Sequence, residues 1–197
     1  MDKDLLLKRT KKLFFKYGIR SVTMDDIARQ LGISKKTIYE HITDKNDLIA
    51  QIAEIESKQI TLRFNEIKKE GENAIDVLFL LTQFEGKLRE MYPPALEYDL
   101  KKYYPDVYNH VTHQQKKEMY SFIQENLERG IAEEYYRNDL DVQIIAAFHV
   151  ARMDIEIEEH FCSKLNITPQ KIMHELLIYH LHAICSKKGL QYIAEKS

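Results

Sequence analysis

The sequence is poor in the residues that interrupt regular structure. Its 197 residues include only six glycines and four prolines, which leaves little room for long loops. Valine and threonine are also scarce, whereas Leu, Ile, Glu, Lys and Gln dominate and favour helices. We therefore expect an all-α chain with no strand.

Cysteine is equally scarce, and no apolar run is long. Cys162 and Cys185 are too few for a disulfide framework and suit a reducing compartment. No apolar stretch approaches the ~20 residues that span a bilayer. The charged, amphipathic N-terminus lacks the apolar core and cleavage site of a signal peptide. Together these absences predict a cytoplasmic protein with no membrane partner.

The formal net charge of −2 conceals an asymmetry along the chain. Residues 1–48 contain eleven Lys or Arg against seven Asp or Glu, a net charge of +4. The remaining residues have eighteen against twenty-four, a net charge of −6. A basic head on an acidic body fits a nucleic-acid-binding head, although ordinary scatter of surface charge can produce a surplus of this size.

The most specific pattern is the stretch TMDDIARQLGISKKTIYEHIT, which begins at Thr23. Thr23 and Asp26 have the spacing of a capping box at the start of a helix. Gly32 can take the left-handed conformation that ends this helix, and Ser34 can cap a second one. The stretch therefore predicts two short helices joined by a tight turn.

Within this stretch, three residues have the spacing of a helix-turn-helix motif. Ala28 is small where the two helices approach each other, Gly32 forms the turn, and Ile38 packs the second helix on the first. With Ile38 inward, the outer face of the second helix is polar. We expect that face to bind DNA, the alternative being an ordinary solvated surface.

Apolar periodicity predicts further helices before and after the motif. Residues 3–17 form the first, ended by Gly18, and a fourth begins at Asp44 and runs to about Glu70. We expect the others at residues 73–90, 106–129 (ended by Gly130), 140–163 and 169–187, with a short segment at residues 95–103 before Pro105. The predicted architecture is a DNA-binding domain of residues 1–48 followed by a larger helical bundle of residues 49–197.

Residues 13–49, LFFKYGIRSVTMDDIARQLGISKKTIYEHITDKNDLI, resemble the signature of the tetracycline-repressor (TetR) family of bacterial transcriptional regulators. The shared features are aromatic residues before a glycine, a Thr-capped helix with Ile-Ala, Gly-Ile-Ser, and a Tyr in the recognition helix. Lys36-Thr37 departs from the family's frequent Gly-Thr, and His41-Ile42 from its usual aromatic pair. The resemblance implies a helical effector-binding and dimerisation domain after the DNA-binding domain.

Several residues of the motif are candidates for contact with DNA. The first turn of a recognition helix usually meets base edges, where lysines bind phosphate or guanine. The resemblance implies that Thr23, Tyr39 and Lys45 contact the phosphate backbone. His41 faces either DNA or the first helix. The full candidate set is Thr23, Ser34, Lys35, Lys36, Thr37, Tyr39, His41 and Lys45.

The body is expected to bind a small-molecule effector. Tyrosines cluster near its middle, where rings with polar tips either line a pocket or fill the core. An arginine in the apolar run IIAAFHVARMDI needs a partner if it is buried, either an anionic ligand or an internal carboxylate. The candidate ligand-binding residues are Tyr103, Tyr104, Tyr108, Tyr120, His149, Arg152 and Met153.

The last two long helices carry apolar residues on more than one side, so each needs more than one neighbour. The resemblance implies that the second neighbour is the same pair in another copy of the chain. Such a two-fold homodimer requires a palindromic double-stranded operator. The candidate interface residues are Ile144, Phe148, Ile155, Leu177 and Leu181.

No motif for catalysis, cofactor or metal binding is present. His180 and His182 point to different sides of a helix, and there is no CxxC. We expect no enzyme activity, cofactor or metal, and a ligand-responsive regulator that is most simply a repressor. Two alternatives remain: a constitutive DNA-binding protein whose body only dimerises, and a regulator whose body is enzymatic or senses a metal.

Overall fold

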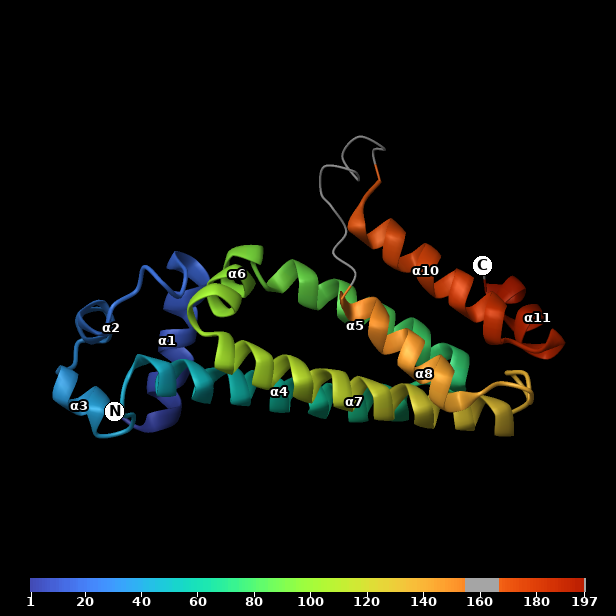
Figure 1. Ribbon diagram of the computed structural model, residues 1–197, viewed down its shortest axis with the longest axis horizontal. Helices are drawn as coiled ribbons and strands as arrows, with labels where there is room; N and C mark the ends of the chain where they lie inside the picture. Colours follow the sequence, from blue (N-terminus) through green and yellow to red (C-terminus); the bar gives the residue numbers. More distant parts are fainter. Residues whose placement is uncertain (155–166, 197) are drawn as a thin grey trace. The chain divides into compact units, whose positions relative to one another are not determined.

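The computed structural model describes residues 1–154 and 167–196, and the regular elements of this part are helices (Figure 1). One isolated bridge, Tyr136 with Cys185, is its only strand-like pairing. The all-α prediction is confirmed. The helices are α1 (Lys3–Tyr17), α2 (Met24–Leu31), α3 (Lys35–Tyr39), α4 (Lys45–Glu70), α5 (Ala74–Met91), α6 (Pro94–Tyr103), α7 (Pro105–Ala132), α8 (Val142–Ala151), the 3-10 turn η1 (Arg152–Asp154), α10 (Pro169–Ile184) and α11 (Lys187–Lys196).

The chain divides into two compact units. Unit 1 comprises Met1–Ile60 and Arg89–Gln115, and unit 2 comprises Thr61–Leu88 and the described part of Lys116–Ser197. Unit 1 therefore contains residues 1–48, the rest of α4 up to Ile60, the end of α5, all of α6 and the start of α7. None of the helices in the described part has the length and apolarity needed to cross a membrane.

Most helix ends follow the local signals in the sequence. Thr23 and Asp26 form the capping box of α2, because each side chain accepts a hydrogen bond from the other residue's backbone. Gly18 and Gly32 end α1 and α2 at φ values of 83° and 67°, where a side chain would be strained. Thr168 caps α10.

Gly130 does not end a helix, contrary to the sequence-based prediction. It lies inside α7, which continues to Ala132. A Cβ atom at Gly130 would come within 2.0 Å of the buried Tyr136 ring. The glycine is therefore explained by the close approach of this ring and not by a turn.

Two boundaries at the C-terminal end also differ from the prediction. The helix expected over residues 140–163 begins as α8 and changes to the turn η1 at Arg152, and residues 155–166 lie outside the described part. The helix expected to end at residue 187 ends at Ile184. A further helix, α11, follows it and was not predicted.

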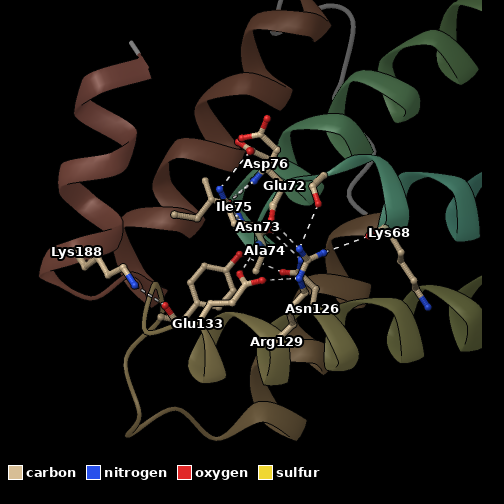
Figure 2. Close-up of polar contacts among 12 residues, drawn as sticks. Lys68, Glu72, Asn73, Ala74, Ile75, Asp76, Asn126, Arg129, Glu133 and Lys188 are labelled. Carbon is tan, nitrogen blue, oxygen red and sulfur yellow. Dashed lines mark hydrogen bonds and ion pairs between the residues drawn. The ribbon is translucent and has the colours of Figure 1, made fainter.

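A hydrogen-bonded arginine joins three helices within unit 2 (Figure 2). Arg129 of α7 donates to three backbone carbonyls where α4 ends and α5 begins, those of Lys68, Gly71 and Glu72. Its Nε also donates to Glu133 at 2.6 Å, and the other oxygen of Glu133 accepts from the Ala74 amide at 2.8 Å. These bonds satisfy orphan carbonyls of α4 and an orphan amide of α5.

Asn126 and Tyr136 extend this network into the core of unit 2. Asn126 donates to the Ala74 carbonyl at 2.9 Å and accepts from the Tyr136 hydroxyl at 3.1 Å. Both side chains are buried. Burial raises the pKa of the Tyr136 hydroxyl well above its ordinary value, so it remains a donor at neutral pH.

We predict that Gly130→Ala destabilises the protein by about 1–3 kcal/mol, even though alanine favours helices. The new methyl group overpacks against Tyr136, whose hydroxyl is held by Asn126. The matched control is Gly86→Ala in α5, where a Cβ meets no atom within 4 Å. Urea unfolding of both variants measures the difference, and a stabilising Gly130→Ala would contradict this packing.

Candidate nucleic-acid interface

Helix α3 is held on unit 1 by its single fully buried side chain. It has five residues, of which Ile38 is the only one with no exposed surface. Ile38 belongs to the same core as Ile27 of α2 and Leu48 of α4, both also fully buried. A helix this short is unstable by itself, so this core determines its position.

The outer side of α3 is polar, exposed and well ordered by its cap. Ser34 accepts from the Thr37 amide at 3.1 Å, and the two hydroxyl oxygens lie 3.0 Å apart. Lys36 is exposed, and Tyr39 is 48% exposed despite its large ring. An exposed tyrosine beside lysines offers both a hydroxyl donor and positive charge to a phosphate backbone.

Lys35 forms a hydrogen-bonded ion pair with Asp25 of α2, in which Nζ of Lys35 lies 2.9 Å from Oδ1 of Asp25. This hydrogen bond raises the pKa of Lys35 above its ordinary value. Both side chains are at least half exposed. The pair is therefore easily exchanged for a phosphate contact.

Thr23 and His41 already have partners in this structure. The Thr23 hydroxyl donates to Asp26 at 2.6 Å while accepting from the Asp26 amide. The hydrogen bonds that the Thr23 hydroxyl and the Thr23 amide donate to the Asp26 carboxylate lower the pKa of that group. His41 places Nε2 3.1 Å from the Met1 carbonyl, so Nε2 is the donor. The sequence left open whether His41 faces DNA or the first helix, and here its ring contacts Met1, which precedes α1.

Lys45 is half-buried and stabilises the segment between α1 and α2. Its Nζ donates to the Ile19 carbonyl at 2.6 Å and lies 6.0 Å and 5.9 Å from the ring centroids of Phe14 and Tyr104. Burial lowers its pKa, and the carboxylates of Asp99 and Asp26 oppose that shift. In this structure its ammonium group serves the fold of unit 1.

Helix α6 contacts the segment between α1 and α2, and no local sequence pattern indicates this contact. Asp99 accepts from the Arg20 amide at 2.9 Å, and the Arg20 guanidinium donates to the Tyr103 hydroxyl at 2.6 Å. Leu96 of α6 is buried in the core of unit 1. The bonded residues are 79 and 83 positions apart, so no local pattern could reveal them.

The candidate ligand-binding residues fall in both units. Tyr103, Tyr104 and Tyr108 belong to unit 1, where the first contacts Arg20 and the last donates to Glu97 at 3.3 Å. Unit 2 contains Tyr120, His149, Arg152 and Met153. Among these four, the structure brings His149 and Arg152 into hydrogen-bonding contact at 2.8 Å.

The candidate interface residues differ in exposure. Ile144 and Phe148 of α8 are 51% and 64% exposed. Leu177 and Leu181 of α10 are buried inside the chain, so they stabilise unit 2 itself and offer no surface to another copy. Ile155 lies outside the described residues.

Over residues 1–154 and 167–196, no group of three or more His, Cys, Asp or Glu is arranged to hold a metal ion. Cys185 is buried as a free thiol, and burial raises its pKa to about 12. A protonated thiol at neutral pH is a poor nucleophile and metal ligand.

Comparison with known proteins agrees with this geometry. Residues 6–52 match the family model described as bacterial regulatory proteins, tetR family. An HTH-type transcriptional regulator of Staphylococcus aureus is 30% identical over 84 residues, which span 40% of this chain and 45% of that relative. The match to this curated relative therefore covers less than half its length.

Two solved structures show the same fold over almost the whole chain. A TetR-family regulator from Cytophaga hutchinsonii superposes with a TM-score of 0.73 at 14% identity, covering 93% of this chain and 94% of that one. One from Agrobacterium tumefaciens gives a TM-score of 0.66 at 18% identity, covering 93% and 97%. Residues 6–52 thus match the TetR family, and almost the whole chain shares the fold of solved TetR-family regulators.

The matched residues 6–52 include the whole helix-turn-helix of α2 and α3. The motif has the family's helix order, and Lys35, Lys36 and Tyr39 lie exposed on the recognition helix α3. Thr23, His41 and Lys45 form intramolecular bonds here. Contact of these residues with DNA stays a prediction.

We predict that Lys45→Met lowers the midpoint of thermal unfolding, because it removes the hydrogen bond to the Ile19 carbonyl. Lys36→Ala is the matched control, since it removes an exposed lysine from the same motif and should leave the midpoint unchanged. Differential scanning calorimetry measures both. Equal midpoints for the two variants would show that Lys45 contributes nothing to the fold.

Proposed function

We propose that the protein is a cytoplasmic, homodimeric repressor without enzyme activity that binds a palindromic operator and is released by a small molecule. The observation that carries this proposal is the capped helix-turn-helix, whose α3 presents Lys35, Lys36 and Tyr39 outward from a rigid core. Two such helices about one DNA turn apart would enter successive major grooves of a two-fold operator.

Exposed apolar side chains support the homodimer. Phe148 is 64% exposed on α8 and Tyr179 is 78% exposed on α10, and both belong to unit 2. We infer that these side chains are covered by a second copy of the chain, because large exposed apolar surfaces mark interaction sites. In a two-fold dimer the same surface meets its own copy, which places one recognition helix on each side of the axis.

Release requires that the effector bind more tightly to a conformation unfit for DNA. Three long helices, α4, α5 and α7, contribute residues to both units. Helix α6 lies between α5 and α7 in the sequence, and its Asp99 and Tyr103 form hydrogen bonds with Arg20. A ligand-induced shift of these helices would therefore reach the DNA-binding motif through rigid elements and specific hydrogen bonds.

Two other functions, constitutive DNA binding and regulation by a metal, would be recognised by the same binding experiments. A constitutive binder would keep its affinity for DNA in the presence of every ligand tested. A metal-sensing regulator would change affinity on addition or chelation of a metal. We favour an organic effector because His149 and His180 of unit 2 pack together and His149 contacts Arg152, whose positive charge opposes a metal cation.

Fluorescence anisotropy with DNA from upstream of the protein's own gene tests the proposal that the protein is a DNA-binding regulator. We predict nanomolar-range binding that weakens steeply with salt. Lys36→Ala should weaken binding and lower the magnitude of the salt slope by about one, as expected for one lost phosphate contact. Lys117→Ala, an exposed lysine of unit 2, is the matched control. If no genomic fragment binds above the nonspecific level, the regulator proposal fails.

Sedimentation tests the dimer. We predict that Phe148→Glu shifts the protein towards a monomer, because it places a charge in an apolar interface. Leu62→Glu is the control, since Leu62 is comparably exposed, at 62%, on α4. A wild-type protein that sediments as a monomer at micromolar concentration would contradict the homodimer, and equal effects of both substitutions would contradict the assignment of α8.

A further inference from the structure

Three side chains of unit 2 form a polar cluster. His149 lies on the apolar helix α8, Arg152 on η1, and His180 on α10. The guanidinium Nη2 of Arg152 lies 2.8 Å from Nε2 of His149. The rings of His149 and His180 meet edge to face, with their centroids 5.3 Å apart.

Both imidazoles of this cluster are neutral at physiological pH. Burial, followed by the positive charge of Arg152, lowers the pKa of His149 well below its ordinary value. The same causes, in the same order, lower the pKa of His180 to about 4. Protonation of either ring would place a second positive charge beside a guanidinium that always remains charged.

The contact with Arg152 determines the tautomer of His149. A guanidinium only donates hydrogen bonds, so Nε2 of His149 must accept. A neutral ring that accepts at Nε2 carries its proton at Nδ1. The cluster therefore contains an Nδ1–H donor on a side chain that is only 2% exposed.

This donor has no acceptor among the described residues. Nδ1 of His149 and Nε2 of His180 are both buried, and neither has a hydrogen-bond partner in the part of the chain that the structure describes. Native proteins rarely leave a buried polar atom unsatisfied, so such an atom requires an explanation. A ligand that supplies an acceptor would provide the missing bond.

We propose that His149, Arg152 and His180 bind the carboxylate group of a small organic molecule. A carboxylate oxygen can accept from Nδ1–H of His149 and from Nε2 of His180 in its Nε2–H tautomer. The guanidinium of Arg152 supplies the positive charge that selects an anion over a neutral acceptor. The same charge opposes a metal ion, although neutral imidazoles are otherwise good metal ligands.

The rest of this ligand should be apolar. The sequence of α8, VQIIAAFHVA, contains two polar side chains in ten residues, Gln143 and His149. Ligand sites of this kind combine mostly apolar walls with a few polar groups that fix orientation. This inference deepens the proposed function, on which it rests for the view that the ligand acts as the effector.

Octanoate and octanamide are matched probes, because they differ in charge at the head group and share the same apolar chain. The experiment uses the full-length protein with ¹⁵N-labelled histidine and records long-range ¹H–¹⁵N spectra, which distinguish the two imidazole tautomers. We expect His149 to be protonated at Nδ1 without ligand. Octanoate should shift the His149 and His180 nitrogen signals in a saturable manner, and octanamide should leave them unchanged.

Substitutions assign these shifts to the cluster. Arg152→Gln should weaken octanoate binding at least tenfold, and Arg137→Gln, which removes an exposed arginine of the same unit, should leave it unchanged. His180→Gln serves as a second variant should Arg152→Gln not fold, and it should also weaken octanoate binding. Unchanged histidine signals with octanoate, equal shifts with octanamide, or equal affinity in these variants would overturn the proposal.

A DNA measurement separates this inference from the proposed function. If octanoate shifts the histidine signals and also lowers the affinity for the operator, both the carboxylate site and its role as effector site are supported. Octanoate that binds the cluster without changing operator affinity supports the carboxylate site and contradicts its role as an effector site. Operator binding with no effect of octanoate on His149 and His180 leaves the regulator intact and rejects the carboxylate site.

Discussion

The burial of Ile38 is the constraint on which the DNA-binding surface depends. Helix α3 has only five residues and one side chain with no exposure, so its position is set by the core that contains Ile27 and Leu48. The cap at Ser34 and the left-handed turn at Gly32 then fix its direction. This explains how a helix too short to be stable alone can present Lys36 and Tyr39 at a defined place.

The local features of this motif could be predicted from sequence because each depends on a few neighbouring residues. The capping box at Thr23 and the turn at Gly32 follow from the chemistry of single side chains and of glycine. Gly130 shows where such logic fails. Its sequence neighbours suggest a helix end, but the decisive neighbour is the Tyr136 ring, whose position follows from tertiary packing.

Contacts between distant segments were beyond sequence reasoning for the same reason. The hydrogen bond of the Arg20 amide with Asp99 joins the segment before α2 to α6, and nothing around either residue signals the other. The clustering of tyrosines at residues 103–108 suggested a ligand pocket, whereas the structure gives Tyr103 a contact with Arg20 inside unit 1. Composition indicates which side chains are available, and the fold determines which of them meet.

The two buried polar clusters of unit 2 differ in how completely they are satisfied. Around Arg129, the donors meet backbone carbonyls and Glu133, and the Ala74 amide and the Asn126 side chain also have partners. Such a network stabilises one arrangement of α4, α5 and α7. Around Arg152, by contrast, two imidazole nitrogens face no partner among the described residues. The first cluster is satisfied within the chain, whereas the two imidazole nitrogens of the second are the groups that the proposed carboxylate ligand would satisfy.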